Sequence, residues 1–153
     1  MGRFLRSLVL MALLVLAGVS ASAQDADRIL GVYKVVGETT GELSHVRIYR
    51  NGDKYDGRII WLEHPNNADG TKRLDAMNPN PALRALPADE ILILDGLHYD
   101  AKKEQRIGGT IYNPVDGKVY DVLAEFENDE VLRVRGYVGS PMFGKTYLWD
   151  RLE

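Results

Sequence analysis

The stretch Gly108-Gly109-Thr110-Ile111-Tyr112-Asn113-Pro114-Val115-Asp116-Gly117-Lys118-Val119-Tyr120 decides the fold of this chain. At its centre, Asn-Pro followed by Asp-Gly predicts a tight turn, because proline fixes one φ angle and glycine accepts a positive one. Extended runs flank this turn on both sides. We therefore predict an antiparallel hairpin here.

The residues after this turn alternate between apolar and polar types. Every second residue from Tyr120 to Phe126 is apolar, whereas Asp121 and Glu125 lie on the opposite face. This period of two is typical of a half-buried antiparallel strand. A similar run returns over residues 132–138, and another closes the chain at 145–151. Four strands and no helix are thus expected between Ile107 and Arg151.

Similar patterns occur earlier in the chain, where Asn51-Gly52 is a strong signal for a two-residue hairpin turn. The expected strands there cover residues 29–36, 44–49, 55–61 and 91–94. About eight short strands separated by turn residues fit a β-barrel or a β-sandwich. We predict an all-β fold, an antiparallel β-barrel of about eight strands.

Residues 63–89 form a long, irregular insertion that contains four of the prolines. Loops of this length inside a compact domain are usually functional or disordered. We expect a cap over one end of the barrel, with a ligand-gripping lid as the alternative. Arg84 in this loop either pairs with Asp75 and pins the loop, or binds a ligand carboxylate.

The N-terminus has the pattern of an export signal. Arg3 and Arg6 precede an apolar segment, Leu8 to Val19, and Ala21-Ser22-Ala23 is a typical cleavage site. We therefore expect a signal peptide over residues 1–23 and a single mature domain over 24–153. Export to the periplasm is the first expectation. An extracellular location and an uncleaved membrane anchor are the alternatives.

Composition excludes several classes of function. The chain has a formal net charge of −3, and loss of Arg3 and Arg6 would make the mature domain more negative. Nucleic-acid binding and binding to anionic membranes are therefore not expected, nor is membrane insertion after signal cleavage. The chain has no Cys, which excludes disulfides and thiolate metal sites.

No catalytic, metal or cofactor signature stands out. His45, His64 and His98 lie on separate expected elements without the paired spacing of metal ligands. A serine nucleophile in a Gly-x-Ser-x-Gly turn is absent. The remaining enzymatic option is a pair of carboxylates, in which Asp75 faces Asp121 or Glu125 across a mouth.

The aromatic residues favour ligand binding. Eight Tyr and two Trp combine apolar area with a polar tip, which suits a pocket mouth, although ordinary sheet faces use them too. The candidate ligand-binding residues are Trp61, Asp75, Asn78, Arg84, Tyr112 and Tyr137. The expected lumen residues are Ile59, Trp61, Ile111, Val122, Ala124 and Val134, with room left by Gly109 and Gly136.

Several motifs in order resemble a family of exported bacterial proteins of unknown function, DUF family 2147. The motifs are Gly31-Val32-Tyr33, Asp56 to Leu62, Asp75-Ala76-Met77-Asn78-Pro79, Gly108 to Tyr120, Leu132 to Tyr137 and Trp149-Asp150-Arg151. The family is similar to the lipocalin-like calycins, small barrels that hold apolar ligands. That resemblance implies a structural role for Tyr33, in place of a Trp, with Arg151 packed over its ring.

Three hypotheses for function follow. The first is binding of a small apolar or amphipathic ligand, such as a fatty acid or lipid fragment, in the barrel. The second is a filled-core structural or protein-interaction module, with an unidentified protein partner. The third is a carboxylate-based hydrolase that acts on a cell-wall or sugar substrate.

Overall fold

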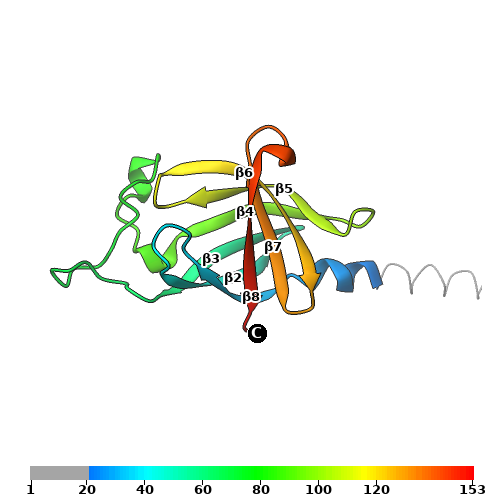
Figure 1. The fold of residues 1–153 in the computed structure, drawn as a ribbon, viewed down its shortest axis with the longest axis horizontal. Coiled ribbons are helices and arrows are strands. Elements are labelled where there is room, and N and C mark those ends of the chain that lie inside the picture. Colours follow the sequence, from blue (N-terminus) through cyan, green and yellow to red (C-terminus); the bar gives the residue numbers. More distant parts are fainter. Residues whose placement is uncertain (1–20) are drawn as a thin grey trace, which may run out of the picture.

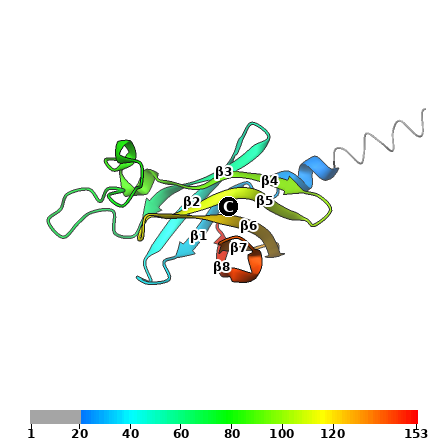
Figure 2. The same cartoon turned by 90° about the horizontal axis from the view of Figure 1, so that it is seen from above.

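Alternating sequence patterns build eight antiparallel strands that close into a barrel, as predicted (Figures 1 and 2). The computed structural model describes residues 21–153, so most of the predicted signal peptide lies outside the described residues. Each strand pairs with its neighbour in the chain, and the last pairs with the first. The strands are β1 (Gly31–Val36), β2 (Leu43–Asn51), β3 (Lys54–Leu62), β4 (Leu92–Asp100), β5 (Gln105–Asn113), β6 (Lys118–Asn128), β7 (Val131–Tyr137) and β8 (Gly144–Arg151).

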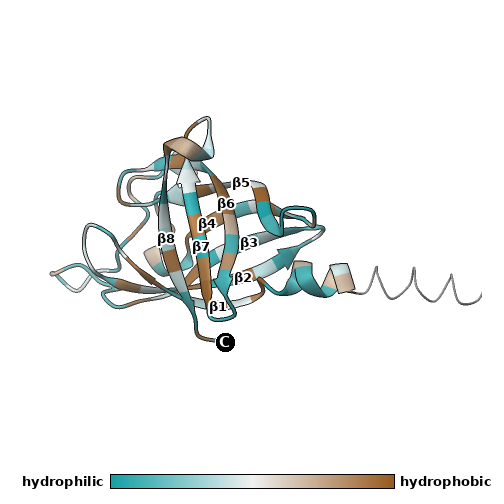
Figure 3. Cartoon of the chain, turned by 45° about the vertical axis from the view of Figure 1, so that its right-hand side comes forward, coloured by the Kyte–Doolittle hydropathy of each residue, from teal (hydrophilic) through white to brown (hydrophobic). Residues whose placement is uncertain are grey.

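Side chains point alternately into and out of the barrel. On β6, Val122 and Ala124 are fully buried, whereas Asp121 is exposed and lies on the outer face, as the alternation predicted. Figure 3 shows the same alternation as brown and teal segments along the strands. The inward side chains form one continuous apolar core.

The seam between β1 and β8 closes the barrel over a short length. The register of this pair joins Tyr33 to Arg151 and Lys34 to Asp150. By contrast, β1 pairs with β2 along all of its residues. Arg151 strengthens the seam, because its Nη1 donates to the carbonyl oxygen of Leu30 at 3.0 Å. The guanidinium carbon of Arg151 also lies 5.1 Å from the centre of the Tyr33 ring.

A short helix over residues 21–27 covers one end of the barrel, opposite the long loop (Figure 1). The buried Arg106 of β5 donates to the carbonyl oxygens of Asp25 and Ala26 in this helix. The guanidinium carbon of Arg106 lies 4.6 Å from the centre of the Tyr99 ring. Carbonyl and aromatic partners of this kind stabilise a cation in a site without a carboxylate. Among residues 21–153, no helix is long and apolar enough to cross a membrane.

The prediction that Trp61 faces the lumen was wrong. The pairing of β2 with β3 joins His45 to Trp61 but Val46 to Ile59, so Ile60 is an extra residue in β3. Such a β-bulge changes which face the following side chains occupy. Trp61 is therefore 42% exposed, and its ring lies 4.5 Å from that of His45 on the outer face.

The long loop between β3 and β4 lies at the end of the barrel opposite the helix. A bridge between Leu74 and Pro87 and two short 3₁₀ helices, η1 (Pro81–Leu83) and η2 (Ala88–Glu90), give it structure. The loop packs against the turn between β5 and β6. A Cβ atom at Gly117 of that turn would lie 2.3 Å from the carbonyl oxygen of Met77.

We expect Gly117→Ala to destabilise the protein more than Gly52→Ala. Both glycines have similar positive φ angles, 70° and 64°, so both alanines carry the same backbone cost of about 1–2 kcal/mol. Only the Gly117 variant also pushes the loop away, which we expect to cost at least about 1 kcal/mol more. Urea unfolding measures both values. An equal loss of unfolding free energy in the two variants would contradict the close contact between Gly117 and Met77.

Tyr33 gives a pH-dependent prediction. Burial raises the pKa of Tyr33 to about 12, and its hydroxyl donates to the carbonyl oxygen of Ile29 at 3.0 Å. Below pH 10 the phenol keeps its proton in both the folded and the unfolded state, so its contribution is complete. Between pH 10 and 12 the unfolded state loses the proton first, and the free energy of unfolding falls.

We therefore compare the wild type with Tyr33→Phe, which has no phenol to ionise. The wild type should be more stable by about 1 kcal/mol at pH 7, because it has the hydrogen bond. Its advantage should decrease by about 2–3 kcal/mol from pH 10 to 12 and change sign. Chemical unfolding at each pH gives the difference. A constant difference across this range would contradict the burial of an un-ionised phenol.

Candidate functional site

A cavity of about 590 Å³ opens at the barrel end opposite the helix. Its apolar floor includes Ile59, Ile93 and Ile111, whose strands direct them inward. The volume lies within the range of small-molecule sites in proteins. The barrel interior is thus packed with side chains at one end and hollow at the other.

Aromatic side chains dominate the cavity wall. Trp149 is buried, and tyrosines from several strands surround it. The aromatic lining residues are Tyr112, Tyr120, Tyr137, Phe143, Tyr147 and Trp149. Such rings offer a large contact area at a low cost in side-chain entropy, and they interact with apolar groups and with cations.

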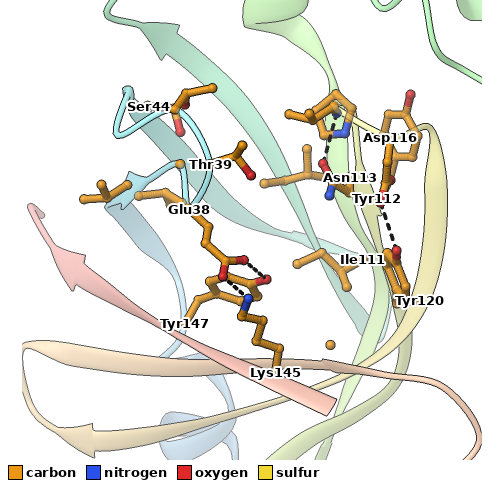
Figure 4. Close-up of a pocket in the computed structure, with 18 of the residues that line it drawn as sticks. Glu38, Thr39, Ser44, Ile111, Tyr112, Asn113, Asp116, Tyr120, Lys145 and Tyr147 are labelled. Atoms are coloured by element: carbon orange, nitrogen blue, oxygen red, sulfur yellow. Dashed lines mark hydrogen bonds and ion pairs between the residues drawn. The ribbon is translucent and has the colours of Figure 1, made fainter. Parts of the chain in front are cut away.

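Glu38 joins two strands at the cavity mouth (Figure 4). Its Oε2 accepts a hydrogen bond from the Tyr147 hydroxyl at 2.9 Å, and its Oε1 forms an ion pair with Lys145. Glu38 follows β1, whereas its partners belong to β8. The contact therefore connects the two strands beyond the short seam where their backbones pair.

Two further polar pairs border the mouth. The Tyr120 hydroxyl donates to Oδ2 of Asp116 at 2.9 Å, and this hydrogen bond raises the pKa of Tyr120 (Figure 4). On the loop side, Nη1 of Arg73 lies 2.6 Å from Oε1 of Glu42 and 2.6 Å from the carbonyl oxygen of His64. Glu38, Glu42 and Asp116 thus each have a hydrogen-bonding or ionic partner at the mouth.

The outermost rim of the cavity is apolar. Large apolar side chains that line the cavity are also exposed to solvent, among them Phe143 at 73%. The exposed rim residues are Val36, Val115, Val138 and Phe143. The cavity thus has exposed apolar side chains at its rim as well as apolar side chains at its floor.

The structure brings four of the predicted site residues together, at the edge of the cavity. Asp75 is buried, and its Oδ1 and Oδ2 accept hydrogen bonds from the Tyr112 hydroxyl at 2.6 Å and from Asn78 Nδ2 at 2.7 Å. The predicted pair of Arg84 with Asp75 does not form: Nε of Arg84 instead donates to the carbonyl oxygen of Asn78 at 2.8 Å, within the same loop. Burial, followed by the bond to Asp75, raises the pKa of Tyr112.

Of the predicted ligand-binding residues, Tyr112 and Tyr137 line the cavity. Asp75, Asn78 and Arg84 lie behind Tyr112 and hold it and the loop in place. The predicted lumen residues also fall into two groups, those that line the cavity and those that do not. Ile59, Ile111 and Gly136 line the cavity, whereas Val122, Ala124 and Val134 belong to the packed core. At Gly109 the backbone of β4 already occupies the space that a side chain would fill.

Sequence reasoning missed the residues that β8 contributes. Lys145, Tyr147 and Trp149 alternate along this strand and all line the cavity, so their spacing of two was the available signal. Glu38 had no such signal, because it lies in a loop and its partners are more than 100 positions away.

The geometry does not assemble the predicted carboxylate pair. Asp121 is exposed on β6, and Glu125 accepts a hydrogen bond from Gln105 at 2.8 Å. Asp75 is bound to Tyr112 and Asn78, as described above. Within residues 21–153, no three His, Asp or Glu side chains gather in a way that could hold a metal ion.

Comparison with known proteins agrees with this architecture. The barrel is similar to the structure of protein HP1028 from the human pathogen Helicobacter pylori, which is described as belonging to the lipocalin family. The TM-score is 0.67 and the sequence identity 28%, over 82% of this chain and 83% of the other. No curated protein matches the sequence.

The model of one protein family matches residues 31–151, from the first strand to the last. Its description reads "Uncharacterized protein conserved in bacteria (DUF2147)". The match covers the whole barrel, including the loop and the cavity wall. The chain therefore belongs to the DUF2147 family, and its barrel is lipocalin-like.

Proposed function

We propose that this protein binds a small apolar or amphipathic ligand of lipid-like size in the open end of its barrel. The observation that carries the proposal is the cavity of about 590 Å³, with an apolar floor, an aromatic wall and an exposed apolar rim. Sites of this size and lining usually enclose most of a small ligand. The similarity to a structure described as a lipocalin supports the same class of function.

The alternative function, a structural or protein-interaction module with a filled core, agrees with one end of the barrel but not with the other. The end under the helix is packed, with Tyr33, Leu97 and Ala124 fully buried. An eight-stranded barrel can fill its whole interior in this way. The open end lacks such packing, which favours ligand binding over a purely structural role.

The hydrolase alternative has weaker support. Asp75, the carboxylate on which it depends, is 2% exposed and accepts hydrogen bonds from Tyr112 and Asn78. A carboxylate with both oxygens engaged in this way lacks access to substrate or water. Its geometry is that of a structural anchor for the loop.

The chain contains a built-in reporter for binding. Of its two tryptophans, Trp149 lines the cavity and is 2% exposed, whereas Trp61 lies on the outer face. A Trp61→Phe variant keeps Trp149 as the single source of tryptophan fluorescence. Titration with apolar and amphipathic molecules should change this emission in a saturable way.

We expect Ile111→Trp to abolish binding. Ile111 projects into the cavity (Figure 4), and an indole there would fill much of the space that a ligand needs. The matched control is Ile60→Trp, because Ile60 is 41% exposed on the outer face. Binding of N-phenyl-1-naphthylamine, followed by the fluorescence of this probe, measures both variants. Equal binding by both variants would contradict the assignment of the cavity as the site.

We also propose that the mature protein is exported and begins at Gln24, on the basis of the N-terminal pattern. Native mass spectrometry of protein purified gently from the cell envelope tests export and binding together. The expected intact mass is that of residues 24–153, with an additional bound mass that is lost on denaturation. A chain that keeps residues 1–23 would contradict cleavage, and the absence of any bound mass, together with no uptake from a lipid panel, would favour the filled-core module.

A further inference from the structure

Both cations that line the cavity are already neutralised. Lys145 forms an ion pair with Glu38, and Arg73 forms one with Glu42. Arg73 also donates to the backbone carbonyl of His64. An anionic head group that bound to either cation would lie beside the carboxylate with which that cation is already paired.

Carboxylates outnumber cations in the cavity wall. The acidic lining residues are Glu38, Glu42 and Asp116. Asp116 accepts hydrogen bonds from the Tyr120 hydroxyl and from the backbone N–H of Lys118, and no cation of residues 21–153 lies within ion-pair distance of it. The described lining residues thus leave one carboxylate without a cationic partner, which disfavours negative charge at the mouth.

Aromatic rings add to this preference. Tyr120 and Tyr147 lie on the cavity wall, and each donates its hydroxyl to a carboxylate at the mouth. The face of an aromatic ring attracts cations and not anions, and the effect grows where water is excluded. Rings and carboxylates at the same mouth favour an uncharged or positively charged group there.

We infer that the cavity discriminates by head-group charge: it takes an amphiphile whose polar end is uncharged or cationic, and it excludes fatty-acid carboxylates and other anions. This inference rests on the proposed function, because it names the ligand class of the same cavity. It also replaces the fatty acid expected from sequence. Both described cations of the cavity wall are already paired, so an ionised carboxylate at the mouth would lie beside at least one like charge.

The test compares three probes with the same ten-carbon alkyl tail and different head groups. Decylamine (as its ammonium ion), decanol and undecanoate are titrated into the Trp61→Phe protein at pH 7.5, below micelle-forming concentrations, with Trp149 as reporter. We expect decylamine and decanol to bind at least about fivefold more tightly than undecanoate. Undecanoate binding as tight as that of the other two would overturn the inference and leave the proposed function intact. Failure of all three probes to bind would overturn both.

A charge variant gives an independent readout. Glu38→Gln removes the carboxylate partner of Lys145, so undecanoate should gain about fivefold in affinity while decylamine loses affinity. The control is Glu127→Gln, which makes the same change in net charge on an exposed residue at the other end of β6. In this control, the ratio of the affinities for the cationic and the anionic probe should equal that of the Trp61→Phe protein. A similar shift in both variants would mean that net charge, not the mouth, sets the preference, and would overturn the inference.

Discussion

The fold depends on one geometric constraint: at any one level along its axis, a barrel of eight strands has room for its own side chains or for a single small ligand. This chain divides that space along the barrel axis. Large side chains and the short helix fill one end, and Arg106 binds the helix carbonyls there. The packed end supplies the core that a chain without disulfides needs. Because the packed end supplies this core, the other end does not need to be filled with side chains, and it contains the cavity.

The polar groups at the open end form closed pairs. Tyr112, Tyr120 and Tyr147 each donate to a carboxylate, and the basic side chains of the mouth bind carboxylates too. A buried or half-buried polar group without a partner would lower stability. Because most of the charged side chains at the mouth already have partners within the protein, they do not require a charged ligand. The same pairs fix the rings that form the cavity wall.

Local pattern was sufficient to predict the architecture, because strand alternation and turn chemistry act over a few residues. The Asn-Pro and Asp-Gly turn after Tyr112 and the alternation along β6 are both as expected. Prediction failed where one residue changes the register, as Ile60 does before Trp61. It also failed at Glu38, whose partners lie on the last strand. Asp75, Asn78 and Tyr112, which were predicted to bind ligand, lie together, but the contact of Tyr112 with the loop could not be read from local pattern.

The short pairing of β1 with β8 has a consequence for self-association. A barrel that closes along its whole length has no free strand edge. Here the register of the seam covers Tyr33 and Lys34, whereas Val35 and Val36 pair with β2 alone. Unpaired edges of this kind are templates for a strand from another molecule, and charged side chains are a common protection. The ion pair of Glu38 with Lys145 joins the loop after β1 to β8 beyond the paired residues, so the contact that shapes the mouth also places two charged side chains beside these strand edges, where charge disfavours the addition of another strand.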